Sequence, residues 1–313
     1  MGLLGYDVED LGRGLRNPSL ALHEVRRQVR ATSTAVNNVW YRHRTDEAFD
    51  LADEDWDVVI LLDGCRYDLF AETNWLEGDL EPRVSPASES WGFMQSTFAG
   101  RTFHDTVYVT ANPHWYELAE GTFHHVVDLL TTDWNEEYGT VLPESVVERT
   151  LAARERFPDK RLIVHFMQPH FPFVGERGRK LDHKGLTLHL DDTDTDEVQV
   201  WSALERGRLS RDAVAAAYAE NLELALPHVE TLLTELPGKT VVTSDHGNLL
   251  GDRLFPIPVR RYGHLPDVRA PELVTVPWLT VPGERLSVTS EPPTADEHSA
   301  EHAEERLEAL GYR

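Results

Sequence analysis

The sequence of 313 residues is poor in cysteine, in lysine and in long apolar runs. Because Cys65 is its only cysteine, no disulfide can form within the chain, and the composition gives no support for secretion. No window reaches the roughly 18 apolar residues of a membrane-spanning helix, and the first residues lack the pattern of a signal peptide. These absences predict a cytoplasmic protein without a membrane span.

Positive charge is also scarce. The chain has 54 acidic residues against 30 lysines and arginines, which gives a formal net charge of −24, and only four residues are lysine. An acidic surface repels nucleic acid and anionic membranes, so neither is expected as a direct partner, although local basic pockets are compatible with this charge. Dispersed acids with few lysines are typical of proteins from extreme halophiles, where salt screens the self-repulsion. We therefore predict a halophilic source.

The length favours one main domain, expected over residues 46–313. Before it, apolar residues at helical spacing from Pro18 to about Arg44 predict an N-terminal helical extension, residues 1–45, that packs on the main domain or on a partner. Residues 175–211 are polar and predict a solvated insertion. A Pro-rich linker precedes a predicted acidic helix over residues 296–313.

Two stretches suggest metal sites but are better explained as solvated surface. In the acidic run Asp191–Glu197 the acids alternate as in a calcium loop, yet Glu197 stands where that loop needs glycine. His298 and His302 lie one helical turn apart, but no other ligand accompanies them.

Two apolar runs predict buried strands that end in carboxylates. Residues 58–62 (VVILL) run into Asp63, and residues 240–243 (TVVT) are followed by Asp245 and His246. Ligands of parallel sheets bind beyond the carboxyl ends of the strands. Asp63 and Asp245 are therefore expected to meet at one site.

Helical segments alternate with these strands. One is predicted from about Asp212 to Leu236, broken or kinked near Pro227, and a third strand ends in the segment from His165 to His170. This alternation favours an α/β fold, a three-layer α/β/α sandwich with a mainly parallel central sheet.

The residues at the two strand ends suit a divalent metal. Asp63, Asp245 and His246 supply two hard oxygens and one nitrogen, a set that fits Mn, Mg, Ca or Zn and leaves coordination positions open. Each motif alone is a weak signal, since Asp-Gly after a strand is often a plain turn.

A third segment strengthens the signal. RVSPASESWGFMQSTFAG (Arg83–Gly100), taken with DGCRYD and SDHGN, resembles the alkaline phosphatase and sulfatase superfamily, in its nucleotide pyrophosphatase/phosphodiesterase and sulfatase branches. The resemblance covers residues 57–283 in motif order and implies an alkaline-phosphatase-like fold. It places Ser90 at the nucleophile, with Ser88 as a rival, and implies Asp63, Ser90, Asp245 and His246 as metal ligands.

The chemistry is consistent with that resemblance. A serine hydroxyl is a poor nucleophile at neutral pH, and coordination to a metal activates it. A helix following Ser90 would also direct backbone N–H groups at a substrate anion.

Other residues depart from the pattern of the two-metal members. His170 stands where those members have aspartate, and Val174 replaces a histidine ligand, so one metal site is favoured and a second is doubtful. His264 lies where a late histidine of the second site is expected. We assign His170 and His264 to anion binding or to protonation of the leaving group.

Two further side chains have alternative roles. Arg66 is a candidate for binding the substrate anion, although a structural pair with Asp68 is the favoured interpretation. His165 is expected to be a histidine with satisfied hydrogen bonds at the end of a strand.

The expected function is a metal-dependent hydrolase or transferase of phosphate esters that forms a covalent seryl ester. Sulfate-ester hydrolysis is the first alternative, but the motif of the formylglycine sulfatases is missing, because the stretch after Ser90 is WGFM and Cys65 lies in another motif. The second alternative is a non-catalytic protein that binds anions or partners in glycan or surface-polymer biosynthesis. The substrate in either enzymatic case is an anionic ester.

Overall fold

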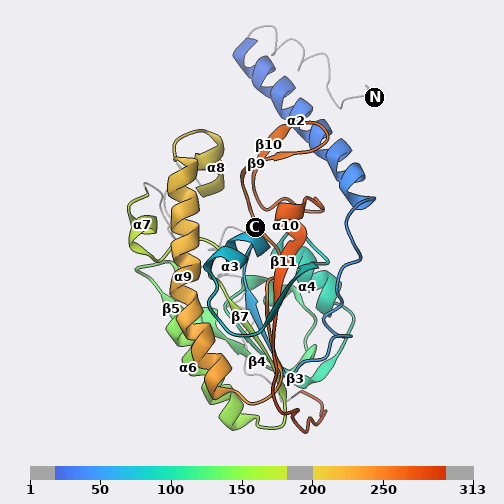
Figure 1. Ribbon diagram of the computed structural model, residues 1–313, viewed down its shortest axis with the longest axis vertical. Coiled ribbons are helices and arrows are strands. Elements are labelled where there is room, and N and C mark those ends of the chain that lie inside the picture. The colour runs from blue at the N-terminus through green and yellow to red at the C-terminus, as the bar shows by residue number, and fades with distance from the viewer. Residues whose placement is uncertain (1–17, 182–199, 294–313) are drawn as a thin grey trace.

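The computed structural model describes residues 18–181 and 200–293, and its centre is a seven-stranded sheet in the order β2-β11-β8-β1-β7-β3-β4 (Figure 1). The strands β8, β1, β7, β3 and β4 run parallel, whereas β11 is antiparallel to both of its neighbours. The predicted mainly parallel sheet is confirmed. Its strands are β1 (Val58–Leu62), β2 (Asp79–Val84), β3 (Phe103–Thr110), β4 (Phe123–Asp128), β7 (Arg161–Phe166), β8 (Thr240–Thr243) and β11 (Thr275–Val281).

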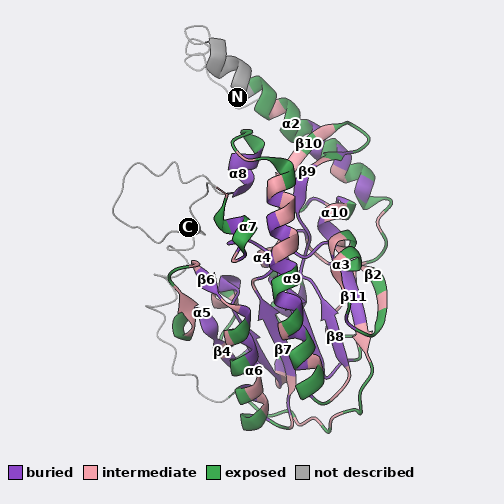
Figure 2. Cartoon of the chain, turned by 60° about the vertical axis from the view of Figure 1, so that its left-hand side comes forward, coloured by how far each residue is buried: buried purple, intermediate pink, exposed green. Residues whose placement is uncertain are grey.

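Helices cover both faces of the sheet, and two small strand pairs lie outside it (Figure 2). The helices are α2 (Pro18–Arg42), α3 (Tyr67–Thr73), α4 (Ser90–Phe98), α5 (Leu129–Thr132), α6 (Pro143–Arg156), α7 (Glu176–Arg179), α8 (Val200–Glu205), α9 (Arg211–Glu235) and α10 (Pro271–Val274), with a 3-10 turn η1 (Pro113–Glu117). The small pairs are β5 (Trp134–Asn135) with β6 (Thr140–Val141), and β9 (Leu249–Leu254) with β10 (Val259–Gly263).

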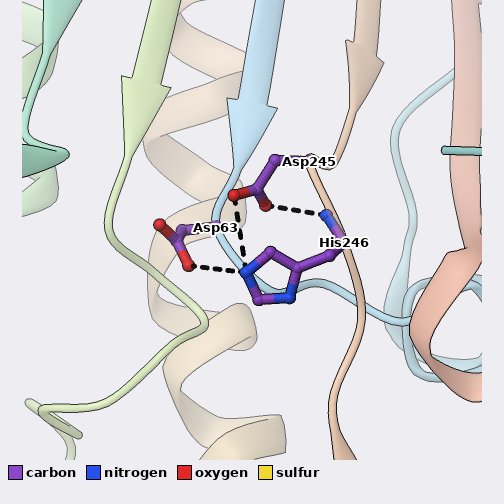
Figure 3. Close-up of side chains that lie close together, drawn as sticks. All are labelled: Asp63, Asp245 and His246. Carbon is purple, nitrogen blue, oxygen red and sulfur yellow. Dashed lines mark hydrogen bonds and ion pairs between the residues drawn. The ribbon is translucent and has the colours of Figure 1, made fainter. Parts of the chain in front are cut away.

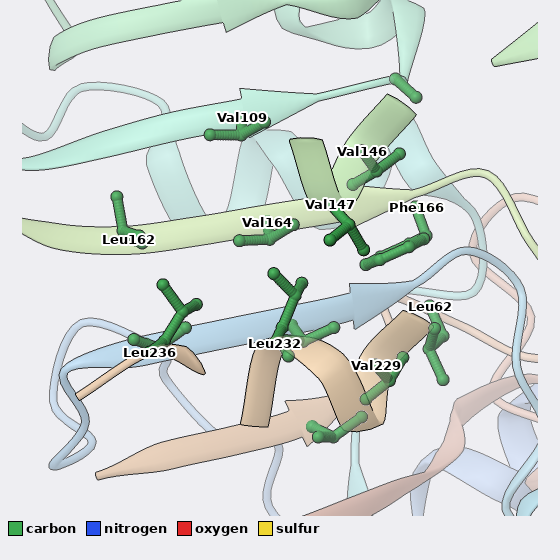
Figure 4. Close-up of a cluster of buried hydrophobic side chains, with 14 of the residues drawn as sticks. Leu62, Val109, Val146, Val147, Leu162, Val164, Phe166, Val229, Leu232 and Leu236 are labelled. Carbon is green, nitrogen blue, oxygen red and sulfur yellow. The ribbon is translucent and has the colours of Figure 1, made fainter. Parts of the chain in front are cut away.

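The alternation of side chains along β1 explains the three layers. Val58, Ile60 and Leu62 pack with apolar residues of α6 and α9, including Val146, Val229 and Leu232 (Figure 4). Val59 and Leu61 point to the opposite face and pack with Phe93, Met94 and Phe98 of α4. Successive residues of a strand point to opposite faces of the sheet, so a strand that is apolar throughout packs against helices on both faces. The predicted three-layer α/β/α sandwich is confirmed.

Of the break or kink predicted near Pro227, the break is absent from helix α9. The helix runs without interruption from Arg211 to Glu235 with Pro227 inside it. Proline removes one backbone hydrogen bond, but Leu222 and Leu226 before it and Val229 after it are fully buried against the sheet. Packing of both halves therefore outweighs the local preference.

Part of the segment predicted as a solvated insertion is buried. Val200, Trp201 and Leu204 of α8 pack in one cluster with Phe171 and Tyr218. The acidic run Asp191–Glu197, the pair His298 and His302, and the helix predicted over residues 296–313 all lie outside the described residues.

The predicted N-terminal helix is present as α2. Its C-terminal half binds the β9–β10 hairpin: the Asn37 side chain donates to the Ile257 carbonyl (2.7 Å) and accepts from the Ile257 N–H (2.8 Å), and the Phe255 N–H donates to the Tyr41 hydroxyl (2.9 Å). Among the described residues, no helix is both long and apolar enough to cross a bilayer. The boundary between an extension and a catalytic domain near residue 45 stays a prediction.

Candidate metal centre and active site

The register of β1 and β8 brings the two predicted carboxylates together. Leu61 pairs with Thr243, and two residues further along each strand come Asp63 and Asp245. Asp245 Oδ1 accepts hydrogen bonds from the N–H groups of Gly64 and His246, both at 2.9 Å, which fixes the carboxylate against the turn after β1. Figure 3 shows the resulting cluster of Asp63, Asp245 and His246.

The three side chains are buried, and each offers a ligand atom within 4.8 Å of the others. His246 Nε2 lies 3.8 Å from Asp63 Oδ1 and 3.5 Å from Asp245 Oδ2. Its Nδ1 lies 2.8 Å from the carbonyl of Gly247. Because a carbonyl only accepts, Nδ1 carries a proton, and Nε2 is the ring nitrogen directed at the carboxylates, as it is in metal-binding histidines.

The charges of this cluster fit a cation. Asp245 Oδ2 is buried without a hydrogen-bond partner, and His246 and His165 offset its burial and lower the pKa of Asp245. Burial, and then the charge of Asp245, raise the pKa of Asp63 well above its ordinary value. Two buried carboxylates without a counter-charge are costly, and a divalent cation removes that cost. The cluster is therefore compatible with a divalent metal.

Ser90 reaches the same cluster from the first turn of α4. Its Oγ lies 3.3 Å from Asp63 Oδ2 and 3.2 Å from His246 Nε2, and the residue is buried. The hydroxyl of Ser88 instead donates to the Leu265 carbonyl (2.7 Å) and accepts from the Val268 N–H (3.2 Å). The structure thus brings together the four predicted metal ligands and engages Ser88 in a neighbouring loop.

The start of α4 differs from the prediction. The carboxylate of Glu89 accepts from the N–H groups of Trp91 (2.9 Å) and Gly92 (2.6 Å). A Cβ atom at residue 92 would lie 2.5 Å from Glu89 Oε1, so glycine permits this close approach. The expectation that these N–H groups face a substrate anion is wrong for these two residues, because a capping glutamate precedes the helix.

Arg66 is bound to protein carboxylates. Its guanidinium contacts both oxygens of Asp68, Asp252 Oδ2 (3.0 Å) and the Asn248 carbonyl (3.1 Å). Burial lowers the pKa of Arg66, but the two carboxylates outweigh it and raise that pKa. This arrangement is the structural pairing with Asp68 that was favoured over anion binding.

His170 and His264 lie beside the cluster. The ring centroids of His170 and His264 lie 5.1 Å apart. The ring centroid of His246 lies 4.9 Å from that of His264 and 6.4 Å from that of His170. His170 Nδ1 lies 2.8 Å from the Phe171 carbonyl, so it carries the proton, and Nε2 is buried without a hydrogen-bond partner. Burial, and then His246, lower the pKa of His170 to about 4. His170 therefore offers a lone pair and not the proton that a leaving group needs.

His264 marks the opening of the site. It is partly exposed, whereas Asp63, Asp245, His246 and His170 are buried. Burial, and then the neighbouring His246 and His170, lower the pKa of His264 well below its ordinary value. Of these five residues, His264 is therefore the one nearest to solvent.

Asn112 was not predicted from the sequence to belong to the site, and His165 was expected only to be a histidine with satisfied hydrogen bonds. Asn112 follows β3 at the same edge of the sheet and donates from Nδ2 to Asp63 Oδ2 at 2.7 Å. His165 Nδ1 bonds the Tyr108 hydroxyl at 2.8 Å, but its Nε2 lies 3.7 Å from Asp63 Oδ2 and has no hydrogen-bond partner. The rule that located Asp63, a polar residue directly beyond an apolar strand, also applies to Asn112.

Helix α9 braces the loops around the cluster. Asn221 donates to the carbonyls of Pro169, His170 and Pro172 and accepts from the Val174 N–H. The Tyr218 hydroxyl, from the same helix, donates to the Gly64 carbonyl. The site is therefore held by hydrogen bonds between segments far apart in sequence.

The chain was compared with known proteins. No protein-family model matches it, and no curated protein sequence matches it at a significant level. A solved structure of the integral membrane protein lipooligosaccharide phosphoethanolamine transferase A from Neisseria meningitidis matches 88% of this chain and 60% of its own length, at 11% identity and a TM-score of 0.50.

Two other structures show weaker likeness. The periplasmic domain of EcEptC from Escherichia coli, in complex with Zn, matches 76% of each chain at 13% identity and a TM-score of 0.47. An alkaline phosphatase superfamily protein from Vibrio parahaemolyticus matches 81% of this chain and 69% of its own, at 12% identity and a TM-score of 0.39.

At such low sequence identities, structural likeness shows the fold of the chain and does not show its activity. The chain spans about 60% of the length of the Neisseria transferase, and the likeness is one of architecture. Together with the sheet order, it confirms the predicted alkaline-phosphatase-like fold.

Proposed function

We propose that the protein is a metal-dependent hydrolase or transferase of phosphate esters, with Ser90 as nucleophile. The observation that carries the proposal is the position of the Ser90 hydroxyl, 3.3 Å from Asp63 Oδ2 and 3.2 Å from His246 Nε2, inside a buried cluster suited to a cation. The solved structures with this fold include a phosphoethanolamine transferase, which supports phosphoester chemistry in general.

Asp63, Ser90, Asp245 and His246 would hold the metal. A divalent cation bound there would favour the alkoxide of Ser90 and neutralise an oxygen of the phosphoryl group. Asp245 is fixed by two backbone N–H groups and Asp63 by Asn112, so the ligands are held in place before substrate arrives.

The residues of this chain then have defined roles. The Ser90 proton passes to solvent as Ser90 Oγ forms a bond to phosphorus and the ester P–O bond breaks, and the leaving oxygen takes a proton from solvent on the partly exposed side, where His264 lies. Water or an acceptor hydroxyl then bonds to phosphorus, the seryl ester breaks, and Ser90 recovers its proton. Hydrolysis and transfer differ only in this second nucleophile.

The number of metals decides the role of His170. Its Nε2 lone pair is in the form that a metal ligand takes, so two bound metals per chain would make His170 and His264 ligands. One metal per chain would leave His170 to contact the substrate. Metal content of the purified protein, measured by mass spectrometry, distinguishes the two arrangements.

The test of the nucleophile is Ser90→Ala compared with Ser88→Ala. We expect Ser90→Ala to lower turnover of an aryl phosphate by roughly 10³-fold or more, with metal content largely kept. Ser88→Ala should stay within about ten-fold of the parent, because its hydroxyl is engaged by the loop 265–268. A fully active Ser90→Ala variant would contradict the assignment.

Matched aryl phosphate and aryl sulfate substrates test the ester class. An unmodified serine suits phosphate, and we expect the phosphate to be turned over faster. Faster turnover of the sulfate would favour a sulfatase. Anion binding without turnover of either ester by metal-loaded protein would favour a non-catalytic role. The cytoplasmic location stays a prediction.

A further inference from the structure

The exposed apolar side chains of this protein gather at one end of the molecule. Nine large apolar residues of the described ranges are exposed, and seven of them lie on α2 or at the tip of the β9–β10 hairpin that packs on it (Figure 1). We call these seven the α2–hairpin patch: Val25, Val29, Val36, Val39, Trp40, Phe255 and Ile257. A gathering of this kind marks an interaction surface, whereas single exposed apolar residues do not.

The patch is continuous along the helix and onto the hairpin. Val25, Val29, Val36 and Val39 follow helical spacing and share one face of α2. The hairpin tip is bonded to Asn37 and Tyr41, which alternate along the helix with Val36 and Trp40. Phe255 and Ile257 therefore extend the apolar stripe at its C-terminal end.

The charge of this end is opposite to that of the whole chain. Residues 25–44 and 249–263 contain eight arginines and one acid, Asp252, whereas the full sequence has 54 acids against 30 basic residues. Asp252 is itself paired with Arg66, and one of the eight arginines, Arg30, is paired with Glu205 of α8. The expectation that an acidic surface repels anionic partners thus applies to the rest of the chain and not to this end.

The patch is also linked to the candidate active site. The hairpin begins at Leu249, three residues after His246, and ends at Gly263, directly before His264. A strand of five or six residues spans about 20 Å, so the hairpin tip lies within that distance of the site opening. Whatever binds the patch is therefore held near His264.

We propose that the α2–hairpin patch docks on the surface of an anionic lipid bilayer. An apolar stripe with a tryptophan and a rim of arginines is the pattern of segments that lie in the bilayer interface, and the arginines add attraction to anionic headgroups. A second copy of the chain would bring two arginine-rich surfaces together, so it is the less favourable occupant. This inference is independent of the proposed reaction.

The test is flotation of the full chain with phosphatidylcholine vesicles, with and without an equal part of phosphatidylglycerol. We expect binding to the anionic vesicles only, reduced about five-fold for each of Arg26→Glu and Arg42→Glu. The double variant Val36→Asp/Val39→Asp should lose about ten-fold or more, because the apolar contact is lost. Salt at about 1 M should weaken the contribution of the arginines to vesicle binding and leave the contribution of the valines unchanged.

Leu224→Asp is the matched control, because Leu224 is an exposed apolar residue of α9 outside the patch, and it should bind vesicles like the parent. Circular dichroism and light scattering accompany each variant, and Phe255→Ser replaces the double variant if that one is misfolded. The proposal is overturned if the monomeric parent does not float, or if the valine variants float equally well. It is also overturned if the parent is a dimer that the valine variants dissociate and neither form floats, because the patch would then join two copies.

Discussion

Two regions depart from the usual distribution, in which apolar side chains are buried and polar ones exposed. The C-terminal edge of the sheet buries polar side chains, and the α2–hairpin end exposes apolar ones. The sheet edge buries Asp63, Asp245 and His246, whereas α2 exposes a row of valines. The buried polar groups have neighbours on every side: backbone N–H groups, Asn112, and loops tied by Asn221. The valines of α2 are exposed on their outer face within the part of the chain that the structure describes. The first region is therefore organised around something inside the fold, and the second around something outside it.

The largest expected effect is at the metal cluster. Asp245→Ala removes a ligand together with the acceptor of the Gly64 and His246 N–H groups. We expect loss of bound metal and a fall in ester turnover of roughly 10³-fold or more. Metal content and turnover, measured on the same samples, check this. Retained metal in the variant would show that the cation binds elsewhere.

A smaller effect is expected where α9 braces the loops. Asn221→Ala leaves the carbonyls of residues 169, 170 and 172 and the Val174 N–H without this partner. We expect the free energy of unfolding to fall by about 2–4 kcal/mol. Urea denaturation measures it. Asn221→Asp sets a buried carboxylate against the same three carbonyl oxygens, so it should be at least as destabilising as the alanine variant.

The next effect depends on pH and metal. In metal-free protein the pKa of Asp63 is raised above its unfolded value, so the stability that Asp63 contributes is lost as pH rises above about 4. Asp63→Asn avoids this loss. With a chelator at pH 8 it should be more stable than the parent by about 1–3 kcal/mol, and the difference should vanish near pH 4.

Bound metal should make the parent more stable than Asp63→Asn, because the parent has a carboxylate ligand that the variant lacks. Thermal unfolding with and without metal tests both halves of the prediction. The control is Asp68→Asn: Arg66 lowers the pKa of Asp68 despite its partial burial, so this change should reduce stability at pH 8 in either condition. Equal stability of parent and Asp63→Asn at pH 8 without metal would contradict a buried charge at Asp63.

The smallest effect is expected at Val36, and its contrast with a core valine separates the two regions directly. Val242→Ala, in β8, empties space in a fully buried core and should cost about 2–3 kcal/mol. Val36→Ala, on the exposed face of α2, should change the stability of the isolated protein by no more than about 0.5 kcal/mol. Chemical denaturation of both variants checks the contrast. A large cost at Val36 would mean that its face is already covered in solution.

Much of the fold followed from local pattern. The apolar runs of β1, β7 and β8 predicted buried parallel strands, and the polar residues directly after β1 and β8 predicted where the site lies. Asp63, Asp245 and His246 meet because β1 and β8 are neighbours in register, and Ser90 joins them from the start of α4. Asp63 and Asp245 were therefore accessible from the sequence, and the resemblance added Ser90.

The remaining features depend on contacts that sequence spacing does not encode. The capping of α4 by Glu89 and the engagement of Arg66 by Asp252 arise from side-chain geometry after folding. The continuity of α9 past Pro227 depends on packing against the sheet, and the tautomer of His170 depends on one carbonyl. These features concern the contacts that a residue makes more than its position in the fold.

The pairing of β1 with β8 also has a consequence for how the protein is made. Asp63 and His246 are separated by most of the chain, and the cluster exists only when β8 has joined the centre of the sheet. During synthesis the amino-terminal half emerges first and holds one carboxylate and a serine without the remaining ligands. Cation capture at this cluster would therefore occur late in folding and would report that the central sheet is complete.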